Sequence, residues 1–264
     1  MNKHNIFEKK LMKKLLLLSI LAFAGNLIKA QELPRKITVG VYGGLSSPLN
    51  AEYALDSYAL PGVSFGLNAD YNFRNNISVG IEFYATAHEM DAQMFADDLL
   101  STQSRHFNVD VLSTEVLTGS FEHYLTMVTA KYNFNLGSKF VVDAGLGLGV
   151  NAFITPAYST TVFFDDPIAL DLQQLTDVGD SFGYAFAAKG DLGIRYNISP
   201  RLGIRLGAQY FSSTNLLYTA TVNTSELDDL LIYDISEVEQ EFDYPASWLN
   251  FSLGLTYSFW NRTE

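Results

Sequence analysis

Large apolar residues alternate with small or weakly polar ones along the C-terminal stretch Trp248–Trp260. Six large apolar side chains occupy every second position from Leu249 to Phe259, and only Asn, Ser, Gly and Thr lie between them. A period of two is typical of a β-strand, because successive side chains point to opposite faces. The intervening residues carry no charge, so the pattern favours a strand with lipid on one face and a narrow lumen on the other.

Seven further segments repeat this alternation, and short polar turns alternate with long connections between them. These predicted strands are Lys36–Leu45, Gly62–Phe73, Ile77–Thr86, Glu122–Phe134, Lys139–Ala152, Gly183–Ile198 and Leu202–Phe211. The short turns are Arg74–Asn76, Asn135–Ser138 and Ser199–Arg201. The sequence therefore predicts an all-β fold, a transmembrane antiparallel up-and-down barrel of eight strands with short periplasmic turns and long extracellular loops.

Aromatic residues on the apolar face gather near the short turns, where an interfacial girdle is expected. They are Tyr71, Phe73, Tyr132, Phe134, Phe140, Tyr196, Tyr257 and Phe259. A soluble eight-stranded barrel of the lipocalin kind is the alternative, and it would place the apolar face inside and the charges outside. The charged residues within the predicted strands lie on the face opposite to the aliphatic run, which favours the membrane barrel.

The N-terminus has the pattern of a secretory signal peptide. Lys9, Lys10, Lys13 and Lys14 precede the apolar run Leu15–Ala24, and Ala30 is the small residue at the predicted cleavage site. Met12 is an equally good start, because a complete signal follows it. We predict a signal peptide over residues 1–30, a barrel domain over 31–264, and location in the outer membrane. Removing 1–30 takes away six of 17 basic and one of 29 acidic residues, which leaves 11 and 28 and a net charge of −17.

Composition excludes several classes of protein. The chain has no cysteine, so thiol catalysis, disulfides and thiolate metal sites are absent. No apolar run long enough for a transmembrane helix follows the N-terminal segment. Only 17% of the residues are charged and 14% are aromatic, which fits a membrane barrel better than a soluble protein. We expect no cofactor, no metal site and no nucleic-acid partner.

Four acidic and four basic residues face the predicted lumen: Asp70, Glu82, Lys131, Asp143, Lys189, Asp191, Arg195 and Arg205. The turn positions set Arg195 opposite Arg205, Asp191 opposite Gln209, and Lys131 opposite Asp143. Two facing arginines repel one another unless a carboxylate lies between them, and Asp143 is the expected carboxylate. The residues predict either a charged gate or an ion-pair plug. We favour the plug, because buried charges must be paired.

The four predicted loops, 46–61, 86–121, 155–181 and 212–245, hold 21 acidic residues and one basic residue, Arg105. We expect an acidic outer surface that attracts basic proteins or divalent cations. Three acidic, leucine-rich pieces recur in these loops, and we expect them to form amphipathic turns over the barrel mouth or, alternatively, a partner site. The pieces begin at Phe95, Leu170 and Glu226, and the same three loops hold the aspartate pairs Asp97 with Asp98, Asp165 with Asp166, and Asp228 with Asp229.

His88 and His123 lie near the loop end of their strands on the lumen side, with Glu89 and Glu122 beside them. A base with an orienting carboxylate is part of many hydrolytic sites, and two histidines can also hold a metal. Neither spacing matches a known motif. We therefore interpret both as solvated residues at the base of the loops and predict no catalytic residue.

The signal peptide, the eight alternating strands and the closing segment Gly254–Phe259 resemble the small outer-membrane barrels of the OmpA/OmpX type. They resemble in particular the PorT-like outer-membrane β-barrel domain proteins of Bacteroidota. In such proteins the last strand is read by the barrel-assembly machinery, and Tyr257 and Phe259 match that signal, although the tail Trp260–Glu264 follows them. The resemblance implies a barrel in outer-membrane lipid and names no ligand. From the acidic loops we expect a structural or surface-interaction role for a monomer. A lipid-modifying enzyme and a passive small-solute pore are the alternatives.

Overall fold

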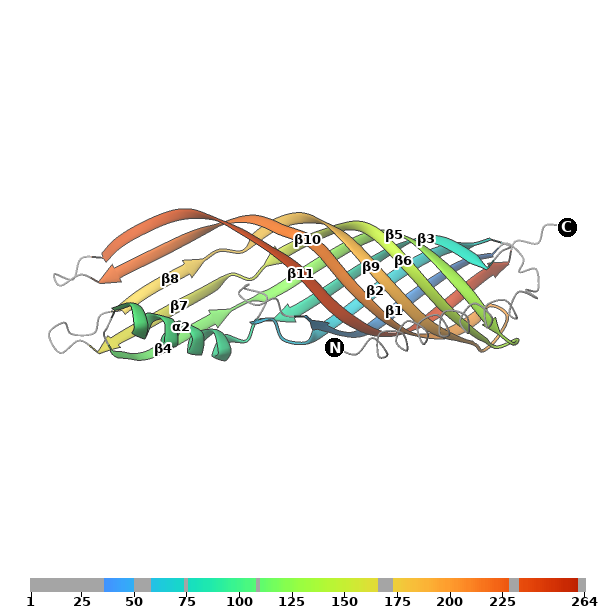
Figure 1. Cartoon of the computed structure of the whole chain (residues 1–264), viewed down its shortest axis with the longest axis horizontal. Coiled ribbons are helices and arrows are strands. Elements are labelled where there is room, and N and C mark those ends of the chain that lie inside the picture. Colours follow the sequence, from blue (N-terminus) through green and yellow to red (C-terminus); the bar gives the residue numbers. More distant parts are fainter. Residues whose placement is uncertain are drawn as a thin grey trace, which may run out of the picture.

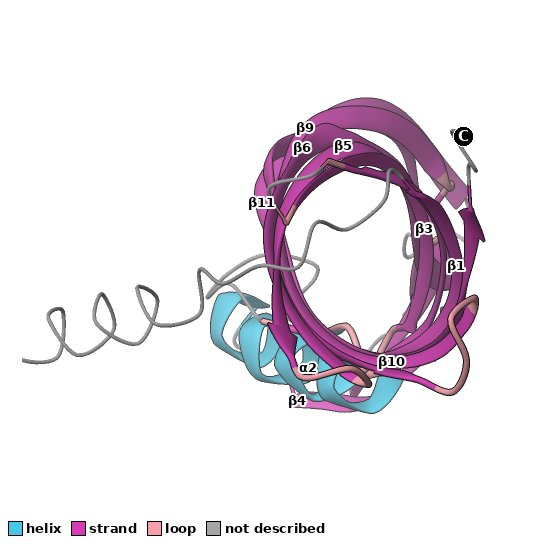
Figure 2. Cartoon of the chain, turned by 90° about the vertical axis from the view of Figure 1, so that its right-hand side faces the viewer, coloured by secondary structure: helices cyan, strands magenta, loops and turns pink. Residues whose placement is uncertain are grey.

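A computed structural model describes residues 36–49, 58–73, 76–107, 110–165, 173–227 and 233–260. Within them, eleven strands form one antiparallel sheet, and eight of these close into a barrel (Figures 1 and 2). The barrel strands are β1 (Lys36–Pro48), β2 (Gly62–Asn72), β3 (Ile77–Glu89), β5 (Ser120–Leu136), β6 (Phe140–Thr155), β9 (Ser181–Asn197), β10 (Leu202–Leu227) and β11 (Tyr233–Trp260). The barrel closes because β11 pairs with both β1 and β10. The predicted signal peptide lies outside the described residues.

The eight predicted transmembrane strands are confirmed, and so is part of the predicted register. Arg195 faces Arg205, and Asp191 faces Gln209. The predicted pairing of Lys131 with Asp143 is wrong, since Lys131 faces Gly145 and Asp143 faces Asn133. The reason is the turn at 137–139, where Gly137 has a φ of 82° that favours glycine. This turn is centred one residue later than predicted, which shifts the register by two.

Apolar side chains cover the outside of the barrel, as a lipid-facing wall requires. Seven of the eight predicted girdle residues are exposed near the short turns, which we call the turn end. A second exposed aromatic group, which includes Tyr124 and Tyr184, lies toward the opposite or loop end. Tyr184 and Tyr196 are 12 residues apart on β9. At about 3.3 Å per residue and a tilt of about 40°, they span about 30 Å along the barrel axis, close to the height of a membrane barrel's apolar band.

Beyond the loop end, β10 and β11 continue as a pair and three more strands join them (Figure 1). These are β4 (Asp110–Thr118), β7 (Tyr158–Asp165) and β8 (Gln173–Val178), in the order β10-β8-β7-β4. We call this part the sheet extension. The prediction that 86–121, 155–181 and 212–245 are loops is therefore wrong over most of their length. These strands could not be recognised from the sequence, because both of their faces carry serine, threonine and acidic residues. The alternation of apolar and polar residues that marks a lipid-facing strand is absent there.

One helix, α2 (Ala92–Phe107), packs against the sheet extension. Asp91 caps its start, since its Oδ1 accepts a hydrogen bond from the backbone N–H of Met94 at 3.0 Å. The ring of Phe95 contacts Tyr58 and Tyr158, with centroids 5.0 and 5.3 Å away. The sequence predicted amphipathic turns over the barrel mouth, whereas this helix lies on the sheet extension and, viewed along the barrel, outside its wall (Figure 2). Among the described residues, no helix is long and apolar enough to cross a membrane.

Candidate functional site: the barrel lumen

The half of the lumen near the turn end holds a chain of ion pairs. Lys131 Nζ lies 3.1 Å from Asp70 Oδ2 and 2.5 Å from Glu82 Oε1. Lys189 forms an ion pair with Glu82 as well. Along their strands these side chains alternate with lipid-facing ones, so they point into the lumen. All four are buried. Glu82 thus connects two lysines from different strands.

Arg205 extends the chain to the other side of the lumen. Its Nη2 lies 2.5 Å from Asp143 Oδ1 and 2.9 Å from Asp191 Oδ2. Its Nε also donates to Asp143, at 3.1 Å. Asp191 lies 3.8 Å from Lys189 Nζ, which joins the two halves. The uninterrupted order of the seven residues is Asp70, Lys131, Glu82, Lys189, Asp191, Arg205 and Asp143.

Arg195 is the one residue of the predicted network that the structure does not bring into this chain. Asp143 bonds Arg205, and no ion pair joins Arg195 to a described carboxylate. The Nε of Arg195 is buried without a hydrogen-bond partner. Arg195 and Arg205 face each other, and both neighbouring aspartates, Asp143 and Asp191, pair with Arg205. The predicted sharing of an aspartate between the two arginines is not observed.

Tyr42 supports the ion pairs from β1. Its hydroxyl donates to Asn68 Oδ1 at 2.8 Å, and Asn68 Nδ2 donates to Asp70 Oδ2 at 2.5 Å. The guanidinium of Arg205 lies 5.5 Å from the centre of the Tyr42 ring, within cation–π range. A Cβ at Gly254 would lie 2.1 Å from Tyr42 Cδ1, so glycine at this position makes room for the ring. The polar side chains are hydrogen-bonded to one another, as buried groups require.

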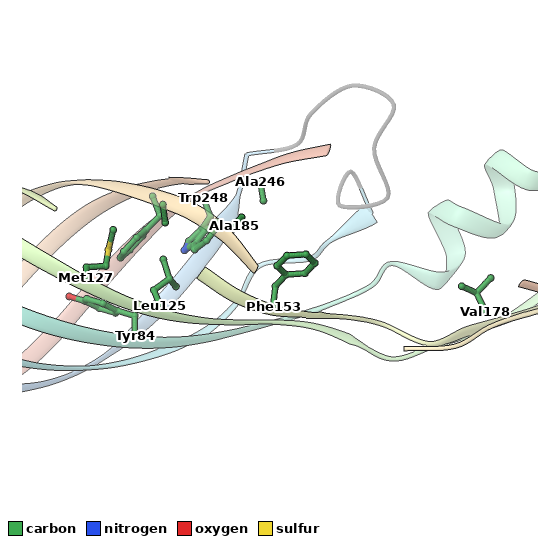
Figure 3. Close-up of a cluster of buried hydrophobic side chains, with 10 residues drawn as sticks. Tyr84, Leu125, Met127, Phe153, Val178, Ala185, Ala246 and Trp248 are labelled. Carbon is green, nitrogen blue, oxygen red and sulfur yellow. The ribbon is translucent and has the colours of Figure 1, made fainter. Parts of the chain in front are cut away.

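Above the ion pairs, toward the loop end, apolar and aromatic side chains fill the lumen (Figure 3). We call this cluster the aromatic plug; it contains Tyr84, Leu125, Met127, Phe153, Ala185, Ala187, Phe211, Ala246 and Trp248. The ring of Phe211 stacks on Trp248 with centroids 5.4 Å apart. Lys189 Nζ lies 5.2 Å from the centre of the Tyr84 ring, where plug and ion pairs meet. The sequence reasoning missed the plug, although Leu125 and Met127 share the inward parity of Lys131.

His88 and His123 line the upper edge of the plug. The prediction that they are solvated is wrong, because both are buried. His88 Nδ1 lies 3.1 Å from the backbone oxygen of Leu60, and its Nε2 lies 3.3 Å from Ser46 Oγ. His123 stacks on Trp248 with centroids 4.7 Å apart, and its Nδ1 lies 3.1 Å from Asn151 Nδ2. Loop residues and inward-facing strand residues together bury the two rings.

The two glutamates considered beside these histidines do not orient them. Glu122 accepts a hydrogen bond from the hydroxyl of Tyr124, a lipid-side residue, at 2.6 Å. Glu89 is exposed and has the outward parity of its strand. The structure therefore separates both carboxylates from the imidazoles, so that the described residues here form no arrangement of base, orienting carboxylate and nucleophile.

The predicted acidic residues of the loops are only partly described. Asp97 and Asp98 lie on α2, where Asp97 accepts a hydrogen bond from Gln93 and Asp98 accepts one from the Tyr58 hydroxyl at 2.7 Å. Burial and the nearby Asp98 carboxylate raise the pKa of Tyr58 to about 12. Asp165 ends β7. Asp166, Asp228 and Asp229 lie outside the described residues.

No curated protein matches the chain significantly. Solved structures that resemble it include neisserial surface protein A, with 13% identity, 85% of this chain and 97% of that chain covered, and a TM-score of 0.40. The attachment invasion locus protein Ail of Yersinia pestis has 14% identity, covers 86% and 100%, and has a TM-score of 0.42.

The outer membrane protein OprG of Pseudomonas aeruginosa has 15% identity, 89% and 100% coverage, and a TM-score of 0.40. Likeness at this level carries no argument about function. The sequence profile of the outer membrane protein beta-barrel domain matches residues 15–259. This match spans nearly the whole chain, and the closed barrel of the structure agrees with it. The chain therefore belongs to the family of outer-membrane proteins with a β-barrel domain.

Proposed function

We propose that the barrel is a closed membrane anchor that displays the sheet extension and α2 outside the cell as a non-catalytic binding surface. The observation that carries this proposal is the continuation of β10 and β11 well beyond the loop end, where they pair with one another up to Leu227 and Tyr233. A barrel that served only as a pore would not need three additional strands and a helix on one side of its mouth. The extension continues the barrel sheet beyond the membrane-facing wall through the pairing of β10 with β8.

The contents of the lumen support an anchor rather than a passive solute pore. The aromatic plug and the ion-pair chain lie one above the other along the barrel axis, so that a solute would have to displace both. Breaking the lower layer would separate buried charges, which costs several kcal/mol. An eight-stranded barrel also has an interior only wide enough for its own side chains.

The two faces of the sheet extension differ in their surroundings. On the face that carries Tyr158, where α2 packs, Val162 and Val178 are buried. On the opposite face, Leu117 is 76% exposed, and Glu115 and Asp177 are exposed as well. An open sheet face with acidic residues and an exposed leucine suits a partner that combines basic and apolar side chains. The acidic composition of the surrounding segments also favours basic proteins or divalent cations.

Salt-dependent binding to intact cells tests this proposal. The measurement is the binding of a basic protein probe, such as lysozyme, to cells that display the wild-type chain or a variant with Glu115→Gln and Asp177→Asn. We expect the variant to bind more weakly and the difference to vanish at high salt, since the Debye length falls from about 10 Å at 0.1 M to about 3 Å at 1 M. Glu89→Gln, at the exposed end of β3 and outside the sheet extension and α2, is the control for the loss of an acidic charge.

Planar-bilayer recording of the purified chain separates the anchor from its alternatives. We expect no stable unit conductance. A reproducible conductance together with unchanged binding by the double variant would support a passive pore and overturn the proposal. Lipid analysis of cells with and without the chain addresses the lipid-modifying alternative, for which we expect identical lipid profiles.

A further inference from the structure

Three buried polar atoms without a hydrogen-bond partner gather around His123. Among the described residues they are Thr86 Oγ1, Asn151 Oδ1 and Trp248 Nε1. Asn151 is hydrogen-bonded to His123 through its other amide atom, Trp248 stacks on His123, and Thr86 is its cross-strand partner on β3. Buried polar groups in folded proteins nearly always have a partner, so such a concentration around one imidazole points to a ligand.

His88 lies beside this cluster and faces the same imidazole. The two ring centroids are 6.2 Å apart, and the residues lie on the neighbouring strands β3 and β5. Two imidazoles that bind one ion at about 2.0–2.1 Å have centroids about 5–6.5 Å apart, because each ring centre lies about 3.2 Å from the metal. The observed separation of 6.2 Å falls within that range.

The Nδ1 atoms of both histidines are held by other groups, and the hydrogen-bond partner of His88 Nε2 is the Ser46 hydroxyl, which can itself bind an ion. The two Nε2 atoms are therefore the ones that a ligand would engage. His88 Nδ1 lies 3.1 Å from the carbonyl oxygen of Leu60, so this nitrogen carries the proton. Nitrogen and oxygen of an asparagine amide are assigned from the hydrogen-bond pattern, and turning the amide of Asn151 would place its Oδ1 as acceptor for His123 Nδ1–H. A metal-binding histidine donates its second N–H to an oxygen in this way. With the amide turned, the Nδ2 of Asn151 would replace Oδ1 as the amide atom without a partner.

We propose that His88 and His123 bind one divalent transition-metal ion through their Nε2 atoms, with the hydroxyl of Ser46 as a third ligand. Ser46 Oγ lies 3.3 Å from His88 Nε2, on the adjoining wall of the lumen. Asn151 and Leu60 are positioning residues that fix the two rings. The site lies beyond the proposed surface role, because it is inside the lumen and does not involve the sheet extension.

The donor set selects the kind of ion. Imidazole suits Zn²⁺, Cu²⁺ and Ni²⁺, whereas Ca²⁺ and Mg²⁺ require several oxygen ligands. No third His, Cys, Asp or Glu joins the pair among the described residues, so water completes the coordination. Such a site holds an exchangeable ion. We expect the ion to enter from the loop end, because His88 lies next to the exposed Glu89 at the end of β3.

Trp248 is a built-in reporter for this test, because it stacks on His123 at 4.7 Å. The chain has two tryptophans, and Trp260→Phe leaves Trp248 as the only fluorophore of this type. Full-length folded protein in detergent micelles is titrated with CuCl₂. We expect saturable quenching at one equivalent, and at least tenfold weaker binding in His88→Gln and in His123→Gln. His106→Gln is the matched control and should titrate like the parent.

Two further measurements keep the outcome decisive if a variant folds poorly. Migration of unheated samples on gels reports whether each variant forms its barrel, and electron paramagnetic resonance of bound Cu²⁺ reports nitrogen ligands directly. We expect two imidazole nitrogens in the parent and an effect of Asn151→Ala that Asn151→Asp reverses. Quenching that also occurs with CaCl₂, that persists in both folded histidine variants, or that is absent altogether would overturn the proposal and leave water as the partner of the three atoms.

Discussion

Lys189 forms an ion pair with Glu82 inside the lumen, although the two residues are 107 positions apart in the chain. Both side chains are at most 1% exposed. Glu82 also binds Lys131, so its carboxylate neutralises cations from β5 and β9. Distant strands of the barrel are thereby tied by one buried acidic group, in addition to the hydrogen bonds between neighbouring strands.

Replacing this carboxylate should destabilise the barrel strongly. Glu82→Gln leaves two buried lysines with weaker compensation, and we expect a loss of about 3–5 kcal/mol in the free energy of unfolding. Asp143→Asn should cost less, because Arg205 keeps Asp191. Urea unfolding in lipid or detergent measures both, and Asp97→Asn on the exposed side of α2 is the control. Equal stability of Glu82→Gln and the parent would contradict a structural role for the ion pairs.

The aromatic plug and the ion pairs should close the lumen independently. Trp248→Ala removes a fully buried side chain and should lower the free energy of unfolding by about 3–5 kcal/mol. Because the ion-pair chain remains below it, we expect no conductance from this variant in planar bilayers. A step conductance in Trp248→Ala would show instead that the plug alone closes the lumen.

Gly66 makes room for the Tyr84 ring. A Cβ there would lie 2.5 Å from Tyr84 Cε1, and the three nearest atoms all belong to that ring. Gly66→Ala should therefore cost about 1–3 kcal/mol by overpacking. Tyr84→Leu in the same chain should reverse most of that cost, and a double-mutant cycle measures the coupling. Gly43→Ala is the control, because no atom lies within 4 Å of its added Cβ.

The contact between Tyr58 and Asp98 should make the packing of α2 sensitive to alkaline pH. The pKa of Tyr58 is raised from 10.0 to about 12 by burial and by Asp98, so packing favours the neutral phenol. The contribution of the neutral Tyr58 phenol to the stability of α2 packing is complete below pH 10, and it is lost as the pH rises through about 12. Proteolysis of α2 should therefore increase over this window, and in Tyr58→Phe this pH-dependent increase should be absent. An identical increase in both chains would assign the effect to other groups.

The transmembrane strands could be predicted because lipid and lumen impose a period of two on every one of them. Ser199–Arg201 also gave the correct register, so Arg195 was placed opposite Arg205. The register after β5 could not be obtained in the same way, since it depends on the φ of Gly137. In a turn of unknown length, a shift of one residue at its centre moves the opposing residues by two.

The sheet extension and the aromatic plug were missed for different reasons. In the extension, β4 exposes Glu115 and Leu117 on one face and carries Thr114 and Val116 on the other, so neither face has a clear polarity. In the plug, the inward parity of Phe211 and Trp248 was visible. An apolar residue inside a barrel was not expected, however, because the lumen had been interpreted from its charges alone.

Phe211 and Trp248 are cross-strand partners, and the register of β10 and β11 shifts immediately beyond them, between Ser212 and Asn215. A bulge of this kind is where a strand pair bends. The hairpin of β10 and β11 therefore bends next to the two stacked rings of the plug. A force on the part of this hairpin in the sheet extension would reach those rings through the same two strands.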